Sequence, residues 1–124
     1  MRNYCCVSVC DETFDLTIVV ENTPQIGESQ FQKVKTFAKQ FIDAFDVKDG
    51  GTHVAIVSYG ARPLVHTLLN SFSGPGLNKR IIEDRIDEID YQSESVVSPG
   101  SALSEVLDTV YADGSGARNG TNKV

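Results

Sequence analysis

Two short apolar runs with an amphipathic segment between them constrain this chain more than any other feature. Residues 15–20 read Asp-Leu-Thr-Ile-Val-Val, and residues 53–59 read His-Val-Ala-Ile-Val-Ser-Tyr. Both runs are rich in β-branched residues and poor in polar ones, which is typical of strands buried on both faces of a parallel sheet. Gly, Pro and polar residues follow each run, so we expect a loop at the end of each strand.

The segment between the two runs has the clearest helix pattern. Its apolar residues recur at three- and four-residue spacing and form one broad stripe: Phe31, Val34, Phe37, Ala38, Phe41, Ile42 and Phe45. Most charged side chains of the segment lie off this stripe: Lys33, Lys35, Lys39 and Asp43. Aromatic side chains gathered on one helix face favour packing in the core against a sheet over a ligand pocket.

The rest of the chain adds one strand and two helices. Residues 64–69 form a third apolar run, and only the four residues 60–63 separate it from the second run. A parallel crossover needs a dozen or more residues, so we expect an antiparallel edge strand that forms a hairpin with the second strand. Apolar spacing predicts helices over residues 77–89 and 101–111, and the polar tail 112–124 is expected to be a flexible loop.

The order strand, helix, strand, strand, helix, helix is typical of an α/β protein with a doubly wound, three-layer α/β/α sheet. In such a sheet the first strand is central and ligands bind beyond its carboxyl end, so the loop Glu21–Gly27 is the predicted recognition site. The chain supplies strands for only one side of the first strand, and we therefore expect a domain truncated after its third helix. The open edge of that strand predicts self-association through strand pairing. We assign residues 1–13 to an N-terminal cysteine-containing segment and residues 14–124 to the partial domain.

Composition argues against two classes of partner. The net charge is −6 without a cluster of Lys and Arg, which argues against binding nucleic acid through its phosphates. No apolar stretch reaches the roughly 18 to 20 residues that a membrane helix needs, so we expect no insertion into a membrane. The three cysteines, Cys5, Cys6 and Cys10, all lie in the first ten residues. Free thiols and pairing with a cysteine outside this chain are both compatible with this odd count.

The sequence does not favour catalysis. The two histidines, His53 and His66, lie in predicted strands, where a histidine is far more often a packed or surface residue than a catalytic base. A contact of His66 with Ser58 or Tyr59 on the neighbouring strand is conceivable. However, no Gly-x-Ser-x-Gly elbow and no phosphate-binding glycine loop accompanies it. We therefore predict a binding module and not an enzyme.

From Asp15 onward the chain resembles the von Willebrand factor A domain, the integrin I-type fold. Residues 15–27 and the pattern Phe31-x-x-Val34-Lys35-x-Phe37 are similar to the family's first strand, metal loop and first helix. Residues 53–59 resemble its second strand, residues 68–72 the end of its third strand, and residues 100–103 the start of the helix after its second metal loop. The resemblance implies a Rossmann-like fold and, in most members, a metal-ion-dependent adhesion site.

The family's first metal loop reads Asp-x-Ser-x-Ser, whereas this chain has Glu-Asn-Thr-Pro-Gln at residues 21–25. By this resemblance Glu21, Thr23 and Gln25 hold the positions of metal ligands. The hydroxyl ligand of the second loop corresponds to Val97, which cannot coordinate a cation, although Ser95 or Ser98 would replace it after a register shift. Magnesium requires near-octahedral oxygen geometry at about 2.1 Å, so we predict no cofactor and at most weak Mg²⁺ binding.

The predicted contact surface for a partner consists of loop residues: Asn22, Thr23, Pro24, Gln25, Ser95 and Ser98. Since the family prefers protein ligands such as collagens and other matrix components, the resemblance implies a secreted, extracellular module for cell adhesion or matrix binding. The triplet Asn119-Gly120-Thr121 predicts N-glycosylation and agrees with that location. The alternative is an intracellular scaffold of the same fold in a multiprotein complex, which the unpaired cysteines and the lack of a signal-peptide pattern favour.

Overall fold

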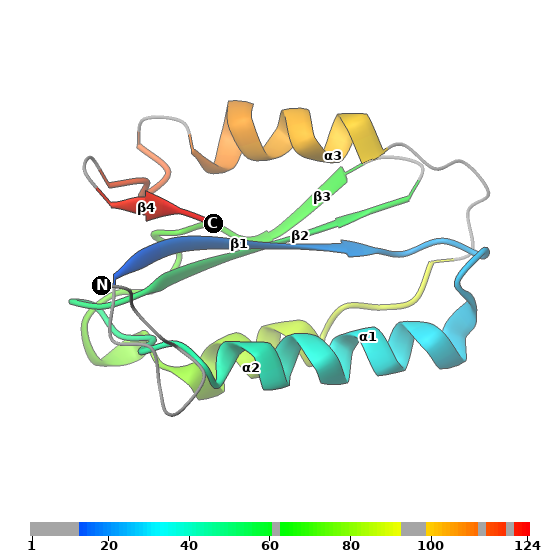
Figure 1. Cartoon of the computed structure of the whole chain (residues 1–124), viewed down its shortest axis with the longest axis horizontal. Helices are drawn as coiled ribbons and strands as arrows, with labels where there is room; N and C mark the ends of the chain where they lie inside the picture. The colour runs from blue at the N-terminus through cyan, green and yellow to red at the C-terminus, as the bar shows by residue number, and fades with distance from the viewer. Residues whose placement is uncertain (1–12, 61–62, 93–98, 112–113, 119–120) are drawn as a thin grey trace, which may run out of the picture.

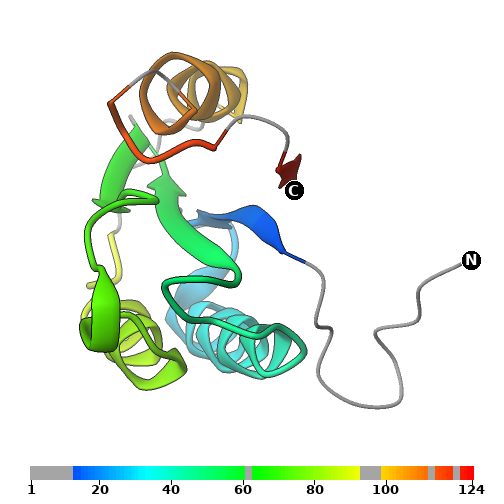
Figure 2. The same cartoon turned by 90° about the vertical axis from the view of Figure 1, so that its left-hand side faces the viewer.

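The computed structural model describes residues 13–60, 63–92, 99–111, 114–118 and 121–124, which are arranged in three layers (Figure 1). The central sheet has the strand order β3-β2-β1-β4. Its strands are β1 Phe14–Glu21, β2 His53–Tyr59, β3 Pro63–Thr67 and β4 Asn122–Lys123. Helices α1, Gly27–Ile42, and α2, Lys79–Asp87, cover one face of the sheet, and α3, Pro99–Glu105, covers the other (Figure 2). This arrangement confirms the predicted doubly wound α/β fold.

The two apolar runs pair as predicted. β1 and β2 are parallel, in register from Asp15 opposite His53 to Glu21 opposite Tyr59. β3 runs antiparallel to β2, as the short connection required, with one register shift at Ile56/Val57. The β2 segment 54–57 is at most 1% exposed because it has helices on both faces, and this explains why it contains no polar residue.

Each face of the sheet has its own hydrophobic core. The larger core lies under α1 and α2 and includes Leu16, Phe31 and Ile82. The smaller core lies under α3, which continues into one turn of π-helix, Val106–Val110 (η2), and so brings both end residues of that turn onto the sheet. No helix in the described part of the chain is long and apolar enough to cross a bilayer.

Helix α2 begins two residues later than its apolar pattern predicted. Asn78 Oδ1 accepts a hydrogen bond from the Ile81 N–H at 3.0 Å, so Asn78 caps the helix and Leu77 stays outside it. A short 3₁₀ turn, Gly74–Gly76 (η1), precedes the cap. The local side-chain to backbone bond therefore sets the start of the helix, and apolar spacing does not.

The prediction that the whole apolar stripe of α1 lies in the core is wrong for two phenylalanines. Phe37 is 66% exposed and Phe41 40% exposed. Both line a groove between α1 and β1. In contrast, Lys35, which was expected off the stripe, is buried, and its Nζ donates to Asp87 O at 2.9 Å and to Ile89 O at 3.0 Å. Lys35 thus reaches from α1 to the C-terminal end of α2, where a lysine can satisfy backbone carbonyls that the helix leaves free.

The prediction of a flexible tail is wrong for the last described residues. Residues 122–123 form β4, which pairs with β1 in parallel, with Phe14 opposite Asn122 and Asp15 opposite Lys123. The Val124 N–H donates to Asp15 O at 2.9 Å, and the Thr17 N–H donates to Val124 O at 2.6 Å. The first strand therefore has neighbours on both sides at its start. The prediction that strands flank only one side of it is wrong there.

Candidate functional site

The loop that follows β1 lies at the carboxyl end of the sheet, where the sequence predicted a recognition site. At its base, Asn22 is 2% exposed and Thr23 is completely buried, whereas Pro24 and Gln25 are exposed. The base packs closely on the end of β2, because a Cβ atom on Gly60 would lie only 2.6 Å from Asn22 O. The loop therefore has a fixed base and an exposed tip.

The Asn22 side chain ties this loop to the segment that follows α2. Its Nδ2 donates to Asp90 O at 2.9 Å, and its Oδ1 accepts from the Gln92 N–H at 2.8 Å. Tyr91 OH adds a longer bond of 3.4 Å to Thr23 O. These contacts turn Asn22 and Thr23 inward, in contrast to the prediction that both side chains meet a partner. The buried Asn22 amide thus forms its hydrogen bonds with the protein's own backbone.

Glu21, the last residue of β1, forms a small cluster with two hydroxyl groups. Thr23 Oγ1 donates to Glu21 Oε2 at 2.6 Å, and Tyr59 OH points to Glu21 Oε1 at 3.4 Å. Burial raises the pKa of Tyr59, and the charge and hydrogen bond of Glu21 raise it further. The phenol therefore keeps its proton at neutral pH. Each oxygen of the carboxylate faces one hydroxyl donor.

The predicted metal ligands Glu21, Thr23 and Gln25 do not form a donor set that fits Mg²⁺. They supply one carboxylate, which accepts hydrogen bonds from Thr23 and Tyr59, the buried hydroxyl of Thr23 and one exposed amide. Within the described residues, no group of three His, Cys, Asp or Glu side chains comes together. Ser95, Val97 and Ser98 of the second loop lie outside the described residues, as does the predicted glycosylation site Asn119. Binding of Mg²⁺ that is at most weak therefore stays a prediction.

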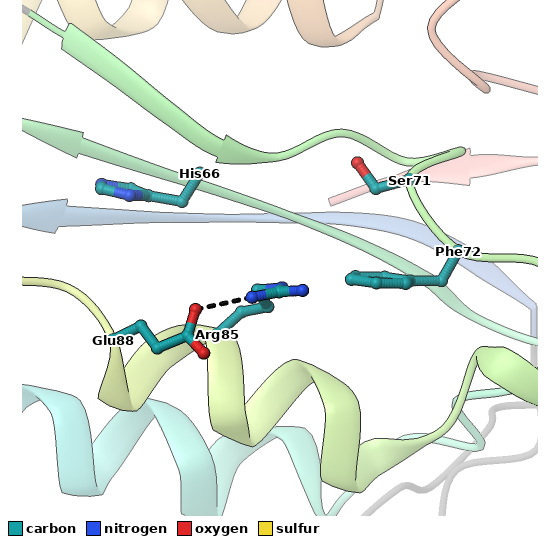
Figure 3. Close-up of a pocket in the computed structure, with 5 residues that line it drawn as sticks. All are labelled: His66, Ser71, Phe72, Arg85 and Glu88. Atoms are coloured by element: carbon teal, nitrogen blue, oxygen red, sulfur yellow. Dashed lines mark hydrogen bonds and ion pairs between the residues drawn. The ribbon is translucent and has the colours of Figure 1, made fainter.

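A second candidate site is a polar cavity of about 430 Å³ between β3 and α2 (Figure 3). Its lining residues are His66, Ser71, Phe72, Arg85 and Glu88. The Arg85 guanidinium carbon lies 5.4 Å from the centre of the Phe72 ring, and its NH1 contacts Glu88 Oε1 at 2.6 Å. Among the described lining residues, Arg85 is the one cation, and it is already paired with a carboxylate.

His66 also contacts Ser58 on the neighbouring strand, a contact that the strand order made conceivable. Ser58 Oγ and His66 Nε2 are 2.7 Å apart. Ser58 is 1% exposed, so its hydroxyl is not accessible to a substrate. Burial lowers the pKa of His66, which keeps the ring uncharged at neutral pH. The pair ties β3 to β2 and has no geometry for nucleophilic attack.

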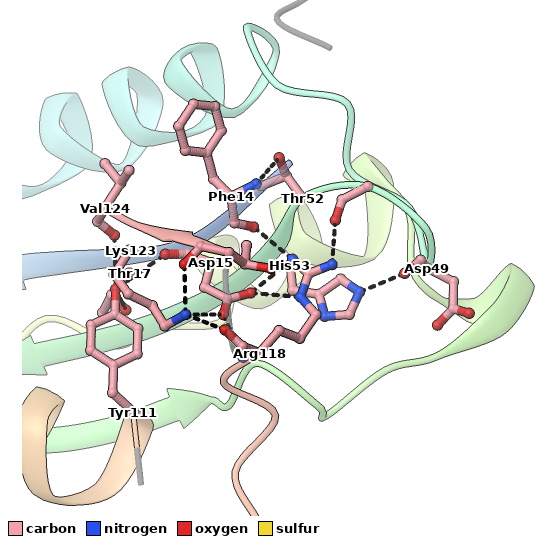
Figure 4. A network of polar contacts seen from close by, with 12 residues as sticks. Phe14, Asp15, Thr17, Asp49, Thr52, His53, Tyr111, Arg118, Lys123 and Val124 are labelled. Carbon is pink, nitrogen blue, oxygen red and sulfur yellow. Dashed lines mark hydrogen bonds and ion pairs between the residues drawn. The ribbon is translucent and has the colours of Figure 1, made fainter. Parts of the chain in front are cut away.

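The most extensive polar network lies at the opposite end of β1 and was not predicted (Figure 4). Asp15 is completely buried. The Arg118 guanidinium contacts Asp15 Oδ1 at 2.7 Å and donates to Gly51 O and Phe14 O, both at 2.9 Å. Lys123 Nζ lies 3.1 Å from Asp15 Oδ2. The network joins residues 118–123 to the start of β1, at the end of the sheet opposite to the loop after Glu21.

The charge balance of this network explains how a buried carboxylate stays ionised. Burial alone would raise the pKa of Asp15. The hydrogen bonds and charge of Arg118, together with the hydrogen bond from Lys123, outweigh burial and hold this pKa below its ordinary value. No sequence signal pointed to the pair, because Arg118 lies 103 residues after Asp15. Four further groups contact the pair: the Arg118 N–H and Lys123 Nζ at the carboxylate, and the carbonyls of Gly51 and Phe14 at the guanidinium.

Comparison with known proteins agrees with this architecture. Residues 15–124 match the family model for the von Willebrand factor type A domain. Mouse matrilin-3 is 27% identical over 104 residues, which cover 84% of this chain and 21% of the relative. Rat von Willebrand factor is also 27% identical over 104 residues, covering 84% of this chain and 23% of the relative. The chain thus spans about a fifth of the length of the curated relatives that it matches.

Solved structures show the same fold at low sequence identity. The structure of proximal thread matrix protein 1 from the mussel byssus is 20% identical, with a TM-score of 0.80 over 92% of this chain and 29% of that one. A further structure of this mussel protein has a zinc-occupied MIDAS motif and a TM-score of 0.75 at 21% identity, over 87% of this chain and 27% of that one. Because the family model covers most of its length, the chain belongs to the von Willebrand factor type A domain family.

Proposed function

We propose that this chain is a non-catalytic module that binds a protein of the extracellular matrix through the loop after β1, without a metal ion. The observation that carries the proposal is the construction of this loop. Its tip, Pro24 and Gln25, is exposed at the carboxyl end of the sheet, while its base is buried. In open α/β sheets this end of the first strand is the usual place for ligands.

A fixed base favours recognition because less conformational entropy is lost when a partner binds. Asn22 is held by two backbone groups of the segment after α2, and its N–H donates to Tyr59 O at 2.8 Å. Pro24 restricts the backbone of the tip further. A loop held in this way presents the same surface before and after binding.

The matrix location is supported by the relatives. They are named matrilin, von Willebrand factor and, for the mussel byssus, a thread matrix protein. The family's preference for collagens and similar ligands makes fibrillar collagen the first partner to test. The net charge of −6 also agrees with a partner surface that carries basic side chains.

The Glu21 cluster supports the proposal that no metal ion is required. Thr23 and Tyr59 place hydroxyl protons against the carboxylate. A cation at this position would compete with these hydroxyl protons for the carboxylate. Calorimetric titration with Mg²⁺, and with Zn²⁺ because the mussel relative has a zinc-occupied motif, should give no heat of binding at micromolar metal. Micromolar affinity for either ion would contradict the metal-free site.

The loop itself is tested by binding to immobilised fibrillar collagen and to a panel of other immobilised matrix proteins. We expect binding that persists in EDTA and that the Gln25→Ala variant weakens by about fivefold or more, the usual effect of an interface residue worth about 1 kcal/mol. Gln40→Ala is the matched control, since Gln40 is exposed on α1 near the opposite end of the helix. Equal losses for both variants, or loss of binding in EDTA, would count against the proposal.

An intracellular scaffold of the same fold is the alternative, and the cysteines near the N-terminus favour it. Mass spectrometry of the native protein distinguishes the two locations. A glycan on Asn119 or oxidised Cys5, Cys6 or Cys10 is expected for the extracellular module. Unmodified Asn119 with three reduced thiols would favour the scaffold.

A further inference from the structure

The polar cavity between β3 and α2 presents more hydrogen-bond donors than acceptors. Its volume of about 430 Å³ lies in the range of small-ligand pockets, about 300–1,000 Å³. The described residues that line it are His66, Ser71, Phe72, Arg85 and Glu88 (Figure 3). Three of these side chains are donors, so the hydrogen bonds that each of them already makes determine what the cavity offers to a ligand.

Arg85 is held in place and keeps most of its donors. Its guanidinium carbon lies 5.4 Å from the centre of the Phe72 ring, and its Nη1 donates to Glu88 Oε1 at 2.6 Å. A guanidinium has five N–H groups. Within the described residues, the contact with Glu88 is the only hydrogen bond of the Arg85 side chain. The other N–H groups are therefore available, and the side chain is 38% exposed, so a ligand can reach them.

His66 supplies a second donor, because its contact with Ser58 sets its tautomer. Ser58 Oγ and His66 Nε2 are 2.7 Å apart, and in the part of the chain that the structure describes the buried hydroxyl has no other partner. A buried hydroxyl needs an acceptor for its proton, so it donates to Nε2 and the uncharged ring carries its proton on Nδ1. His66 Nδ1 is not one of the buried atoms that lack a partner. Its N–H is therefore accessible.

Ser71 adds a third donor. Its Oγ accepts the Leu68 N–H at 2.8 Å, while the hydroxyl proton has no acceptor among the described residues. The carboxylate of Glu88 is the one charged acceptor among the described lining residues, and Arg85 already uses part of it. A group that supplies acceptors alone therefore fits the cavity best.

We propose that this cavity binds the carboxylate of an acidic side chain on a partner protein. The two oxygens of a carboxylate match two parallel N–H groups of a guanidinium. His66 Nδ1–H and Ser71 O–H serve the remaining lone pairs from the same cavity. Phosphate and sulfate groups also supply acceptors alone, but phosphate carries up to two charges and sulfated glycans are polyanions. Glu88 beside Arg85 and the net charge of −6 repel such ligands more than a single carboxylate.

Glu88 acts as an internal competitor in this site. It is 62% exposed, and an exposed ion pair of this kind contributes little to stability. An external carboxylate competes with Glu88 for the same cation. Removal of Glu88 should therefore strengthen binding, whereas removal of Arg85 should weaken it. A purely structural ion pair would not give opposite effects for its two partners.

The proposal is tested by titrating the 124-residue chain with N-acetylglutamic acid α-amide at neutral pH and constant ionic strength. Binding is followed by NMR of the backbone amides and of the Arg85 Nε–H. N-acetylglutamine α-amide has the same shape without the charge and is the matched control; inorganic sulfate and phosphate represent the other oxyanions. We expect the acid to shift signals around the cavity with a Kd of about 1–10 mM, as for other ligands of this size, and the amide to shift none.

Four variants test the assigned roles. Arg85→Ala should weaken binding of the acid by about tenfold or more, and Ser71→Ala by about threefold. Glu88→Gln should strengthen it by about threefold, because the competing carboxylate is gone. Arg80→Ala is the matched control, since Arg80 is an exposed arginine of the same helix outside the cavity, and it should leave the Kd unchanged. Circular dichroism of each variant verifies that it is folded.

Several results would overturn the proposal. They are the lack of saturable shifts with the acid, equal shifts with the acid and the amide, a loss for Arg80→Ala as large as for Arg85→Ala, and weaker binding to Glu88→Gln. Tighter binding of sulfate or phosphate than of the acid would assign the cavity to a different oxyanion. The inference is independent of the proposed function, because the loop tip at Pro24 and Gln25 does not line the cavity. Failure of collagen binding therefore leaves it unaffected.

Discussion

Replacing Arg118 by alanine should destabilise the fold more than the removal of any exposed charge in the described part of the chain. The Arg118 side chain is only 27% exposed, and Asp15 beneath it is completely buried. The variant removes the guanidinium contacts to Asp15 Oδ1, with Nε at 2.8 Å and NH2 at 2.7 Å. It also leaves the carbonyls of Gly51 and Phe14 without these donors.

The expected magnitude follows from what remains around the carboxylate. Removing one partner of a buried ion pair costs about 3–5 kcal/mol, since the other charge stays buried. Asp15 keeps the Arg118 backbone N–H at 2.7 Å and Lys123 at 3.1 Å. We therefore expect the lower end, a loss of about 3 kcal/mol in the free energy of unfolding. That is a large part of the roughly 5–15 kcal/mol of a typical domain.

Urea unfolding followed by circular dichroism, at one fixed protein concentration, measures this loss. Arg85→Ala is the matched control, because its ion pair with Glu88 is largely solvent-exposed and should contribute about 1 kcal/mol or less. Adding Asp15→Asn to Arg118→Ala removes the buried charge and should recover at least about 1 kcal/mol. If Arg118→Ala costs no more than Arg85→Ala, or if the double variant recovers nothing, the account of the buried carboxylate is refuted.

Three further predictions use the same unfolding assay. The pKa of Asp15 is held below its ordinary 3.8. The stability that ionised Asp15 adds to the fold is therefore complete above pH 3.8 and is lost as the pH falls through the folded pKa. If the wild-type chain loses no more stability below about pH 4 than the Asp15→Asn variant, this prediction is contradicted. Asn22→Ala should lower the free energy of unfolding by about 2 kcal/mol, because two backbone groups lose a buried partner. An unchanged urea midpoint would contradict a stabilising role of these two hydrogen bonds. Gly60→Ala should cost about 1 kcal/mol or more, since its Cβ would lie 2.6 Å from a backbone oxygen, whereas Gly76→Ala, with nothing within 4 Å, should be tolerated far better; equal effects would refute the close approach.

The elements that the sequence predicted correctly are those whose signal is local. The β-branched runs at residues 15–20 and 53–59 became β1 and β2, and the four-residue connection set β3 antiparallel. Helix periodicity located α1 but not which side chains of its apolar stripe are buried, because that depends on what packs against the helix. β4 was missed for a related reason. Two residues are too short for a periodic pattern, and a distant aspartate holds them in place.

The candidate site was predicted in its position but not in its detail. The carboxyl end of a central strand is fixed by topology, so the loop after Glu21 could be located. The direction of the Asn22 side chain could not, because its partners are backbone atoms of Asp90 and Gln92, which carry no residue-specific pattern. Glu21 and Tyr59 end neighbouring strands and are paired in register, so their contact was within reach once both strands were assigned.

The contact between Asp15 and Arg118 also has a consequence for the order of folding. The two residues are 103 positions apart, so their contact has a high contact order and closes a loop that includes most of the chain. During synthesis, β1 emerges from the ribosome early, yet its buried carboxylate has no cation to neutralise it until Arg118 follows. We therefore expect β1 to be held in its final position only after the segment with Arg118 has left the ribosome. An arrested nascent chain that ends before Arg118 should stay sensitive to protease.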